Sequence, residues 1–331
     1  MTNYDTEIDN SLKYNVLPNT DIYDFRETPF EEIGKQYYEF CRENLNIQSE
    51  KVNICPNVFV FNNSYSSNAL AKLNNNNFSI IINLGLLIKC KNNYLENASL
   101  DLYIEKKIGA VIGKFDNKIS GLAFQIATNF TYYHELGHLF QFTKKSEYLE
   151  LNEHVNETST YSLLKHCLEI NADSFASIAI ASHITQYLEK TFQENLNKEI
   201  CEDVIVILGG CLLNHIANFY SDITRIYLRE FSHPHPFLRI FNSILSLVNY
   251  INQSTFLKEK AIEIHMYETF KRIIDFYIEL EDEKIFKTNF KVAFEKGAEI
   301  KHEMIEYLGQ LINFNLDDYN NALELWNKKI L

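Results

Sequence analysis

The chain has 331 residues, of which 46% are hydrophobic, and this content supports a large core in one or two domains. Its formal net charge of −13 repels phosphate backbones, so we expect no nucleic-acid partner. The counts of glycine (10) and proline (5) are low, which excludes a loop-rich or disordered chain.

The N-terminal part is polar, and residues 1–27 are predicted to be irregular. Met1–Asn10 has neither a basic segment nor an apolar one, so we expect no secretory signal. The six cysteines form no C-x-x-C pair and are predicted to be mostly buried free thiols, typical of a reducing compartment. Together these features predict a cytoplasmic protein.

The first predicted elements are a helix and two strands. The helix should begin at Thr28 and end near Asn46. Residues 52–62 and 78–83 are rich in valine, isoleucine and phenylalanine and are predicted to be strands, and the run Asn74–Asn77 is predicted to form a hairpin loop. Residues 85–113 are expected to be mainly helical.

An apolar, helix-compatible segment over about 119–143 contains the most informative motif, His134-Glu135-Leu136-Gly137-His138. Residues four apart share one face of a helix, so His134 and His138 would present two imidazoles to one metal ion. Glu135 would reach a water molecule bound to that ion. This H-E-x-x-H pattern is typical of zinc hydrolases, with Glu135 as general base. A helix that merely carries two histidines is the alternative.

A third protein ligand is required, because catalytic zinc is usually held by three side chains and one water. The helix predicted over about 158–190 supplies Glu169 and Asp173, four residues apart on one alanine-lined face. We assign Glu169 as the third ligand and Asp173 as the carboxylate that accepts a hydrogen bond from a ligand histidine. An ordinary solvated helix face is the alternative for this pair. Less favoured ligands are Glu153, His154, Glu157 and His166.

The rest of the chain is predicted to be helical, apart from the exposed loop 144–158 and a break at 232–236, where two prolines cannot continue a helix. One helix is expected over about 201–230, and amphipathic helices from 237 to 331. The best apolar runs, Phe78–Cys90 and Val204–Leu213, are shorter than the about 20 residues of a membrane span. We therefore expect no membrane span.

Two elements together resemble the gluzincin metallopeptidases, and two further elements narrow this resemblance. The H-E-x-x-H motif is followed by the E-x-x-A-D element that starts at Glu169. Before them comes Asn68-Ala69-Leu70-Ala71 with Gly85-Leu86-Leu87, and after them His233-Pro234 with Arg239-Ile240. The order is similar to that in the prenyl-protein and heat-shock membrane peptidases, but without their spans. The soluble Lit-type phage-exclusion peptidases share the zinc motif.

The resemblance implies a mainly α fold with a small β-sheet (α+β): a zincin-like core over 28–240 and a helical C-terminal extension over 241–331. It implies that His233 stabilises the oxyanion, with His235 as the alternative, and that Arg239 pairs with Asp173 or another carboxylate. By analogy, the strand Phe78–Asn83 is expected at a sheet edge, where it would pair with an extended substrate.

The sequence therefore predicts an intracellular endopeptidase with one Zn²⁺ ion and a protein or peptide substrate. Two alternatives stay open: a metal-dependent hydrolase of small amides, and an interaction protein with a structural metal site.

Overall fold

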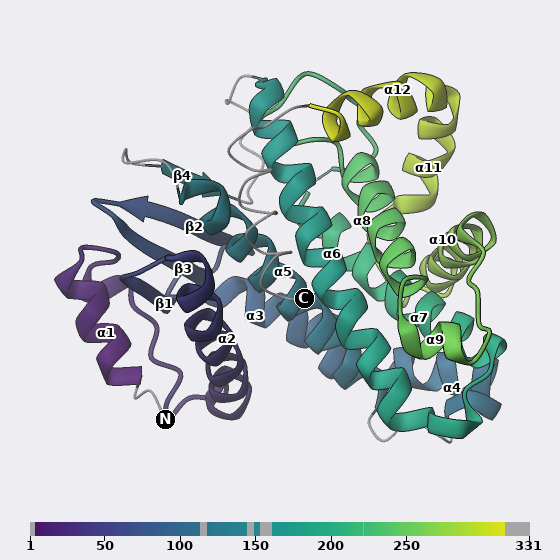
Figure 1. Ribbon diagram of the computed structural model, residues 1–331, viewed down its shortest axis with the longest axis horizontal. Helices are drawn as coiled ribbons and strands as arrows, with labels where there is room; N and C mark the ends of the chain where they lie inside the picture. Colours follow the sequence, from purple (N-terminus) through teal and green to yellow (C-terminus); the bar gives the residue numbers. More distant parts are fainter. Residues whose placement is uncertain (1–3, 113–117, 144–148, 153–160, 221, 315–331) are drawn as a thin grey trace. The chain divides into compact units, whose positions relative to one another are not determined.

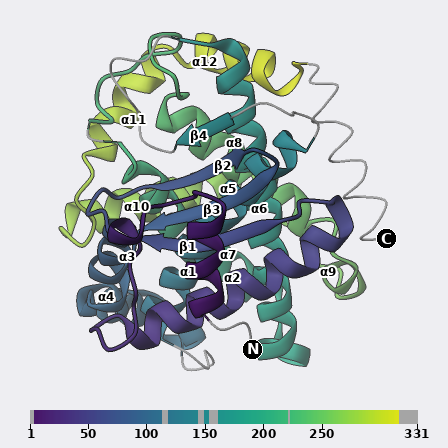
Figure 2. The same cartoon turned by 90° about the vertical axis from the view of Figure 1, so that its left-hand side faces the viewer.

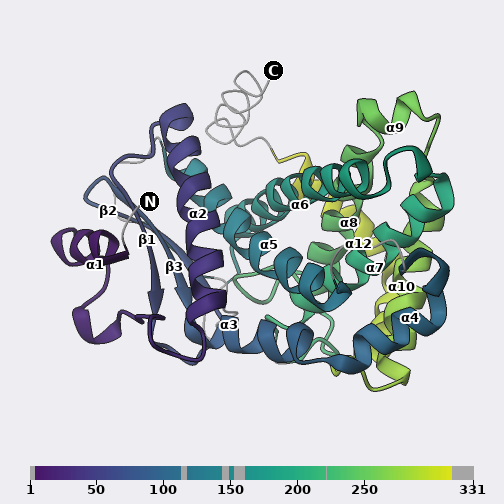
Figure 3. The same ribbon diagram turned by 90° about the horizontal axis from the view of Figure 1, so that it is seen from below.

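The computed structural model (Figures 1–3) describes residues 4–112, 118–143, 149–152, 161–220 and 222–314. It is mostly helical with one small sheet, which confirms the α+β class. Contacts divide the chain into two compact units. The first comprises Met1–Lys89, Thr131–His154 and Asn313–Leu331, and the second comprises Cys90–Phe130 and Val155–Ile312. This division does not follow the boundaries expected at residues 27 and 240, and those domain limits stay a prediction.

The first unit is built around a sheet with the order β1-β3-β2-β4. Its strands are β1 (Asn57–Asn62), β2 (Ala69–Asn74), β3 (Asn77–Asn83) and β4 (Leu149–Asn152). β3 pairs parallel with β1 and antiparallel with β2, and β2 pairs antiparallel with β4. The predicted asparagine hairpin is confirmed: Asn75 and Asn76 have positive φ angles between β2 and β3, a conformation that asparagine tolerates well.

The two faces of β1 are both apolar. Val58 and Val60 pack with Val16 in one cluster. Phe59 and Phe61 turn to the other face and contact rings from α2 (Glu31–Val52). Successive side chains of a strand point to opposite faces, so a continuous apolar run fits a sheet covered on both sides. In Figure 3, α1 and α2 lie on opposite sides of these strands.

The N-terminal segment is not irregular throughout, because residues 4–13 form helix α1 (Tyr4–Lys13) along the edge of β1. The backbone N–H of Phe59 donates to the Glu7 carboxylate at 3.1 Å, and that of Phe61 donates to the Tyr4 hydroxyl at 3.1 Å. The prediction failed because the polar residue Glu7 is buried. Its charge is paired with Arg42 at 2.9 Å, which no local pattern reveals.

The edge assignment of residues 78–83 is also wrong. β3 lies between β1 and β2 and uses both of its sides for pairing. β2, between the two predicted strands, and β4, inside the predicted loop 144–158, were both missed. Short strands without a long apolar run carry little sequence signal.

The second unit is helical. Its helices are α4 (Ala98–Ile112), α6 (Leu163–Phe192), α7 (Lys198–Ala217), α8 (Pro236–Ile251), α9 (Thr255–Glu259), α10 (Met266–Asp282), α11 (Phe290–Glu299) and α12 (Lys301–Ile312). α6 packs along α8, and α7 packs along α10 (Figure 1). A Cβ atom on Gly209 would lie 2.8 Å from Ile273, so glycine permits the close approach of α7 and α10.

α3 (Leu84–Cys90) and α5 (Ile119–Phe142) complete the main helices. The bounds of α5 match the predicted 119–143, whereas α7 ends at Ala217 rather than near residue 230. By length and composition α7 could cross a membrane, but it is almost wholly buried in the structure. A buried core helix meets the same criteria, so α7 is weak evidence for a span.

Candidate metal centre

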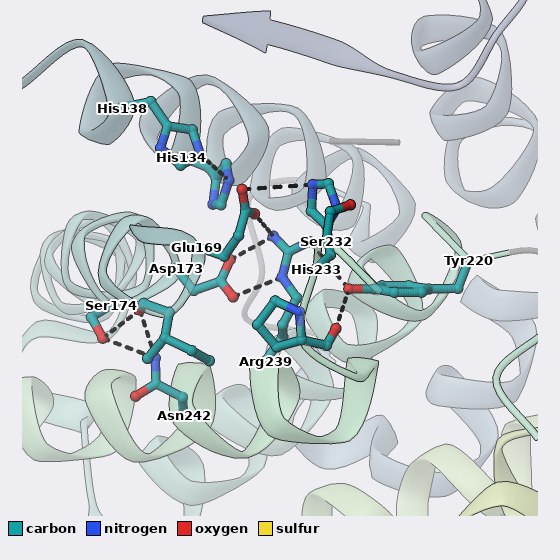
Figure 4. A network of polar contacts seen from close by, with 12 residues as sticks. His134, His138, Glu169, Asp173, Ser174, Tyr220, Ser232, His233, Arg239 and Asn242 are labelled. Atoms are coloured by element: carbon teal, nitrogen blue, oxygen red, sulfur yellow. Dashed lines mark hydrogen bonds and ion pairs between the residues drawn. The ribbon is translucent and has the colours of Figure 1, made fainter. Parts of the chain in front are cut away.

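Helix α5 presents His134 and His138 one turn apart, and both side chains are buried. Their Nε2 atoms lie 2.9 Å apart (Figure 4). His138 Nδ1 lies 2.8 Å from Gln141 Oε1. An amide oxygen only accepts, so the proton in this contact is on Nδ1, and Nε2 is the nitrogen that can bind a metal.

The spacing of the two nitrogens fits a shared ion. Tetrahedral coordination with zinc–nitrogen bonds of about 2.1 Å requires two ligand nitrogens roughly 3.4 Å apart. The observed 2.9 Å separation is about 0.5 Å shorter than this value, so a small movement of the side chains would let both nitrogens bind one ion. The hydrogen bond from a ligand histidine to an outer acceptor is the usual support at such sites, and here Gln141 supplies it.

Glu135 follows His134 directly and is fully buried. Burying a carboxylate is costly unless hydrogen bonds, an opposite charge or a metal offset the lost hydration. A carboxylate adjacent to a ligand histidine meets the positional requirement for a general base.

Helix α6 carries a buried charge cluster made of Glu169 and Asp173 with Arg239 of α8 (Figure 4). Arg239 Nε donates to Asp173 Oδ2 at 2.8 Å, and its Nη2 donates to Oδ1 at 2.7 Å. The same Nη2 lies 3.9 Å from Glu169 Oε2. The pairing of Arg239 with Asp173 was predicted. The guanidinium thus contacts two carboxylates and donates to both oxygens of Asp173. The predicted hydrogen bond from a ligand histidine to Asp173 stays a prediction.

His134, His138 and Glu169 form a buried group that could hold a metal ion, and one ligand atom from each lies within 4.8 Å of the others. Two imidazole nitrogens and one carboxylate oxygen are the donor set of many catalytic zinc sites, which leave a fourth position for water. The donor types suit zinc but do not exclude other divalent ions of the first transition row.

His233 lies beside this carboxylate. Its Nε2 is 3.6 Å from Glu169 Oε1, and its Nδ1 is 2.9 Å from the Ser232 hydroxyl (Figure 4). Because a serine hydroxyl can donate to Nδ1 and a carboxylate near Nε2 only accepts, the arrangement favours the tautomer with its proton on Nε2. Tyr220 donates to the carbonyl of Pro234 at 2.8 Å and so holds the same segment.

His235, the alternative to His233, has a structural role in the described contacts. Its Nδ1 accepts from the backbone N–H of Phe237 at 3.2 Å and caps α8, and its Nε2 donates to the Ile223 carbonyl at 3.3 Å. Burial lowers the pKa of His235 to about 4, so it stays neutral at pH 7. Both ring nitrogens of His235 thus form hydrogen bonds with the backbone, which leaves neither for the substrate.

The other ligand candidates divide into two groups. Glu153, His154 and Glu157 lie outside the described residues. His166 is buried with both ring nitrogens engaged: Nε2 donates to the Phe231 carbonyl at 2.8 Å, and Nδ1 lies 3.0 Å from the Tyr307 hydroxyl. His166 therefore supports the structure near Glu169 and is not available as a ligand.

Two supporting residues were missed by sequence reasoning. Gln141 is three residues after His138 on the same helix face, a spacing that could have suggested the contact. Asn242 donates from Nδ2 to the Ile170 carbonyl at 3.0 Å and to the Ser174 hydroxyl at 2.8 Å, and so links α8 to α6. Nothing local to Asn242 indicates that link.

The buried cysteines do not offer a competing nucleophile. All six are free thiols, and of these only Cys55 is exposed. Burial raises the pKa of Cys167 to about 11 and that of Cys201 and Cys211 to about 12. These thiols therefore stay protonated at neutral pH, consistent with the packing role predicted for them.

Comparisons of the chain with models of protein families, with curated proteins and with solved structures find no match. The function is therefore inferred from the residues and their geometry.

Proposed function

We propose that this chain is a zinc-dependent endopeptidase with a zincin-like core, in which His134, His138 and Glu169 hold the ion. The observation that carries the proposal is the buried grouping of these three side chains, with one ligand atom from each within 4.8 Å of the others. A structural zinc site is usually closed by four protein ligands, whereas a catalytic site has three and a water molecule. The three proposed ligands, with Glu135 next to them as a base for that water, therefore favour a catalytic site.

A bound zinc ion would lower the pKa of a water molecule and polarise the substrate carbonyl. Glu135 accepts the proton of the attacking water and delivers it to the leaving amine nitrogen. His233 donates from Nε2 to the carbonyl oxygen as negative charge develops on it. The Ser232 hydroxyl keeps that proton on Nε2 by donating to Nδ1.

Arg239 orients the carboxylates of α6. Its bidentate bond to Asp173 fixes the guanidinium. The ion pair between its Nη2 and Glu169 Oε2 then limits rotation of the Glu169 carboxylate. Arg239 and Asp173 thus act through Glu169 as positioning residues.

The sheet favours an extended peptide as substrate. β1 ends one side of the sheet, and its edge N–H groups already donate to Glu7 and Tyr4. β4 ends the other side in the order of described strands. We assign to β4 the pairing with substrate backbone that was expected of residues 78–83.

The test compares cells that express the wild type with cells that express Glu135→Gln, by a proteomic search for new protein N-termini. We expect wild-type-specific termini that disappear with Glu135→Gln, because loss of a general base lowers turnover by about 10²-fold or more. Glu189→Gln, at an exposed position of α6, is the matched control and should retain the termini. Equal termini for the wild type and Glu135→Gln, with metal bound to both, would refute the peptidase.

A further inference from the structure

A buried hydrogen-bond chain connects α12 with the segment that carries His233. The Tyr307 hydroxyl of α12 lies 3.0 Å from His166 Nδ1, and His166 Nε2 lies 2.8 Å from the Phe231 carbonyl. Tyr307, His166 and Phe231 are all buried. The chain thus runs from the last described helix, through α6, to a point two residues before His233.

The direction of each bond in this chain is inferred from which atoms can only accept. A carbonyl oxygen only accepts, so the proton of His166 is on Nε2. Burial lowers the pKa of His166 to about 4, so the ring is neutral and Nδ1 holds a lone pair at pH 7. The Tyr307 hydroxyl has one proton, and its 3.0 Å contact with Nδ1 is shorter than its 3.4 Å contact with the Tyr161 hydroxyl, so it donates to Nδ1. Loss of this donor would leave Nδ1 buried without its partner and loosen the ring that holds Phe231.

The C-terminal helices make further contacts with the same segment. The Arg229 guanidinium lies 4.7 Å from the centroid of the Tyr307 ring, and its Nη2 donates to Gln310 at 2.9 Å. Lys296 of α11 donates to the Thr224 carbonyl at 3.2 Å. The segment between α7 and α8 is therefore fixed at several points by α11 and α12.

The position of His233 depends on this fixation. Phe231 and Ser232 precede it directly, and its Nε2 is 3.6 Å from Glu169. A displacement of about 1 Å at a reacting group can lower a catalytic rate by about 10²-fold. A small shift of the Phe231 carbonyl would thus be sufficient to misplace the His233 donor.

We propose that Tyr307 and His166 are positioning residues for His233, so that α11 and α12 are part of the active-site support rather than an appended module. The proposal rests on the proposed function for the role of His233. It gives the helical C-terminal region a mechanism: displacement of α12 releases His166, then Phe231, and finally His233.

The first experiment measures backbone hydrogen–deuterium exchange over residues 227–235 in the full-length, metal-free protein. Tyr307→Phe removes the hydroxyl but keeps the ring beside Arg229. We expect exchange of this segment to accelerate about tenfold, because one buried hydrogen bond is lost. Tyr267→Phe is the control, because it removes the same hydroxyl group from a tyrosine of α10 that is 73% exposed. Unchanged exchange in Tyr307→Phe would overturn the proposal.

The second experiment reads the position of His233 in the cobalt-loaded protein by NMR. The paramagnetic shift of its imidazole N–H depends steeply on its distance from the ion, and the signal is assigned by its loss in His233→Gln. We expect Tyr307→Phe to shift this signal while cobalt binds with the same stoichiometry. If exchange became faster but the His233 signal did not move, Tyr307 and His166 would stabilise the segment without positioning His233, and the proposal would be overturned.

A pair of His166 substitutions serves where Tyr307→Phe fails to fold. The glutamine amide of His166→Gln can reach the place of Nε2 and donate to Phe231, whereas the shorter amide of His166→Asn cannot. We expect His166→Gln to resemble the wild type more closely in both measurements, and equal behaviour of the two variants would overturn the proposal. Failure of the wild type to bind cobalt would instead refute the metal site itself, while the exchange data would still show whether Tyr307 holds the segment.

Discussion

The two histidines of the His-Pro segment occupy different chemical environments. His233 faces the Glu169 carboxylate through Nε2. His235 uses both ring nitrogens for the backbone, at Phe237 and Ile223. One residue thus faces the proposed site, and the other caps α8. Substitution of His233 should therefore affect function, and substitution of His235 should affect stability.

We expect His233→Ala to lower turnover by about 10²-fold or more with little change in unfolding free energy, because it removes an oxyanion donor. His235→Ala should lower the unfolding free energy by about 1–2 kcal/mol through loss of the cap, with turnover largely retained. Urea unfolding measures stability, and release of the termini that depend on Glu135 measures turnover. The reverse pattern would assign the catalytic role to His235.

The sequence was most informative where a side-chain relation follows from helix geometry. The spacing of His134 and His138 alone places their nitrogens on one face, and the structure has them 2.9 Å apart. The contact between His166 and Tyr307 joins residues 141 positions apart and depends on the packing of α12, so no local pattern predicts it. Asn242 was missed for the same reason.

At the scale of elements, α1 and β1 depend on each other. A strand edge exposes N–H groups that need acceptors, and α1 supplies a carboxylate and a hydroxyl to two of them. The two helices that carry the proposed ligands, α5 and α6, were predicted close to their observed bounds, whereas the end of α7 was placed too late. The helix expected over residues 315–331 lies outside the described residues. The sheet order was not predictable, because it depends on which short strands meet in three dimensions.

We expect Glu7→Ala to lower the unfolding free energy by about 3 kcal/mol, because it removes the partner of the Phe59 N–H and leaves the Arg42 charge uncompensated. Asp9→Ala, at an exposed position of the same helix, should change it by less than about 0.5 kcal/mol. Chemical denaturation measures both. Equal effects of the two substitutions would show that α1 does not stabilise the sheet edge.

For the molecule as a whole, buried histidines predict acid sensitivity. Burial lowers the pKa of His166 to about 4, below its ordinary value of 6.5. Below pH 6.5 the unfolded chain therefore takes up a proton that the folded chain does not, and stability falls as the pH falls towards 4. His235 acts in the same direction.

We expect the loss of unfolding free energy between pH 7 and pH 5 to be smaller in His166→Gln than in the wild type by about 2 kcal/mol. The measurement is urea unfolding of metal-free protein at both pH values, so that metal release does not contribute. An equal loss in both proteins would show that His166 titrates normally in the folded state.

The division into two compact units from interleaved segments could not be predicted from the sequence. Composition changes little along the chain, and no linker marks a boundary. What the sequence could indicate was the class of the fold and the likeness of the site to known metallopeptidases. The former is confirmed. The latter stays a prediction, and the proposed function depends on the grouping of His134, His138 and Glu169.

The most direct test of the account is the metal content of the purified protein, measured by elemental mass spectrometry after zinc loading and desalting. The account predicts about one zinc per chain for the wild type and for Glu135→Gln, and a large loss for His138→Ala and Glu169→Ala. Zinc retained by Glu169→Ala at the level of the wild type would contradict the proposed site.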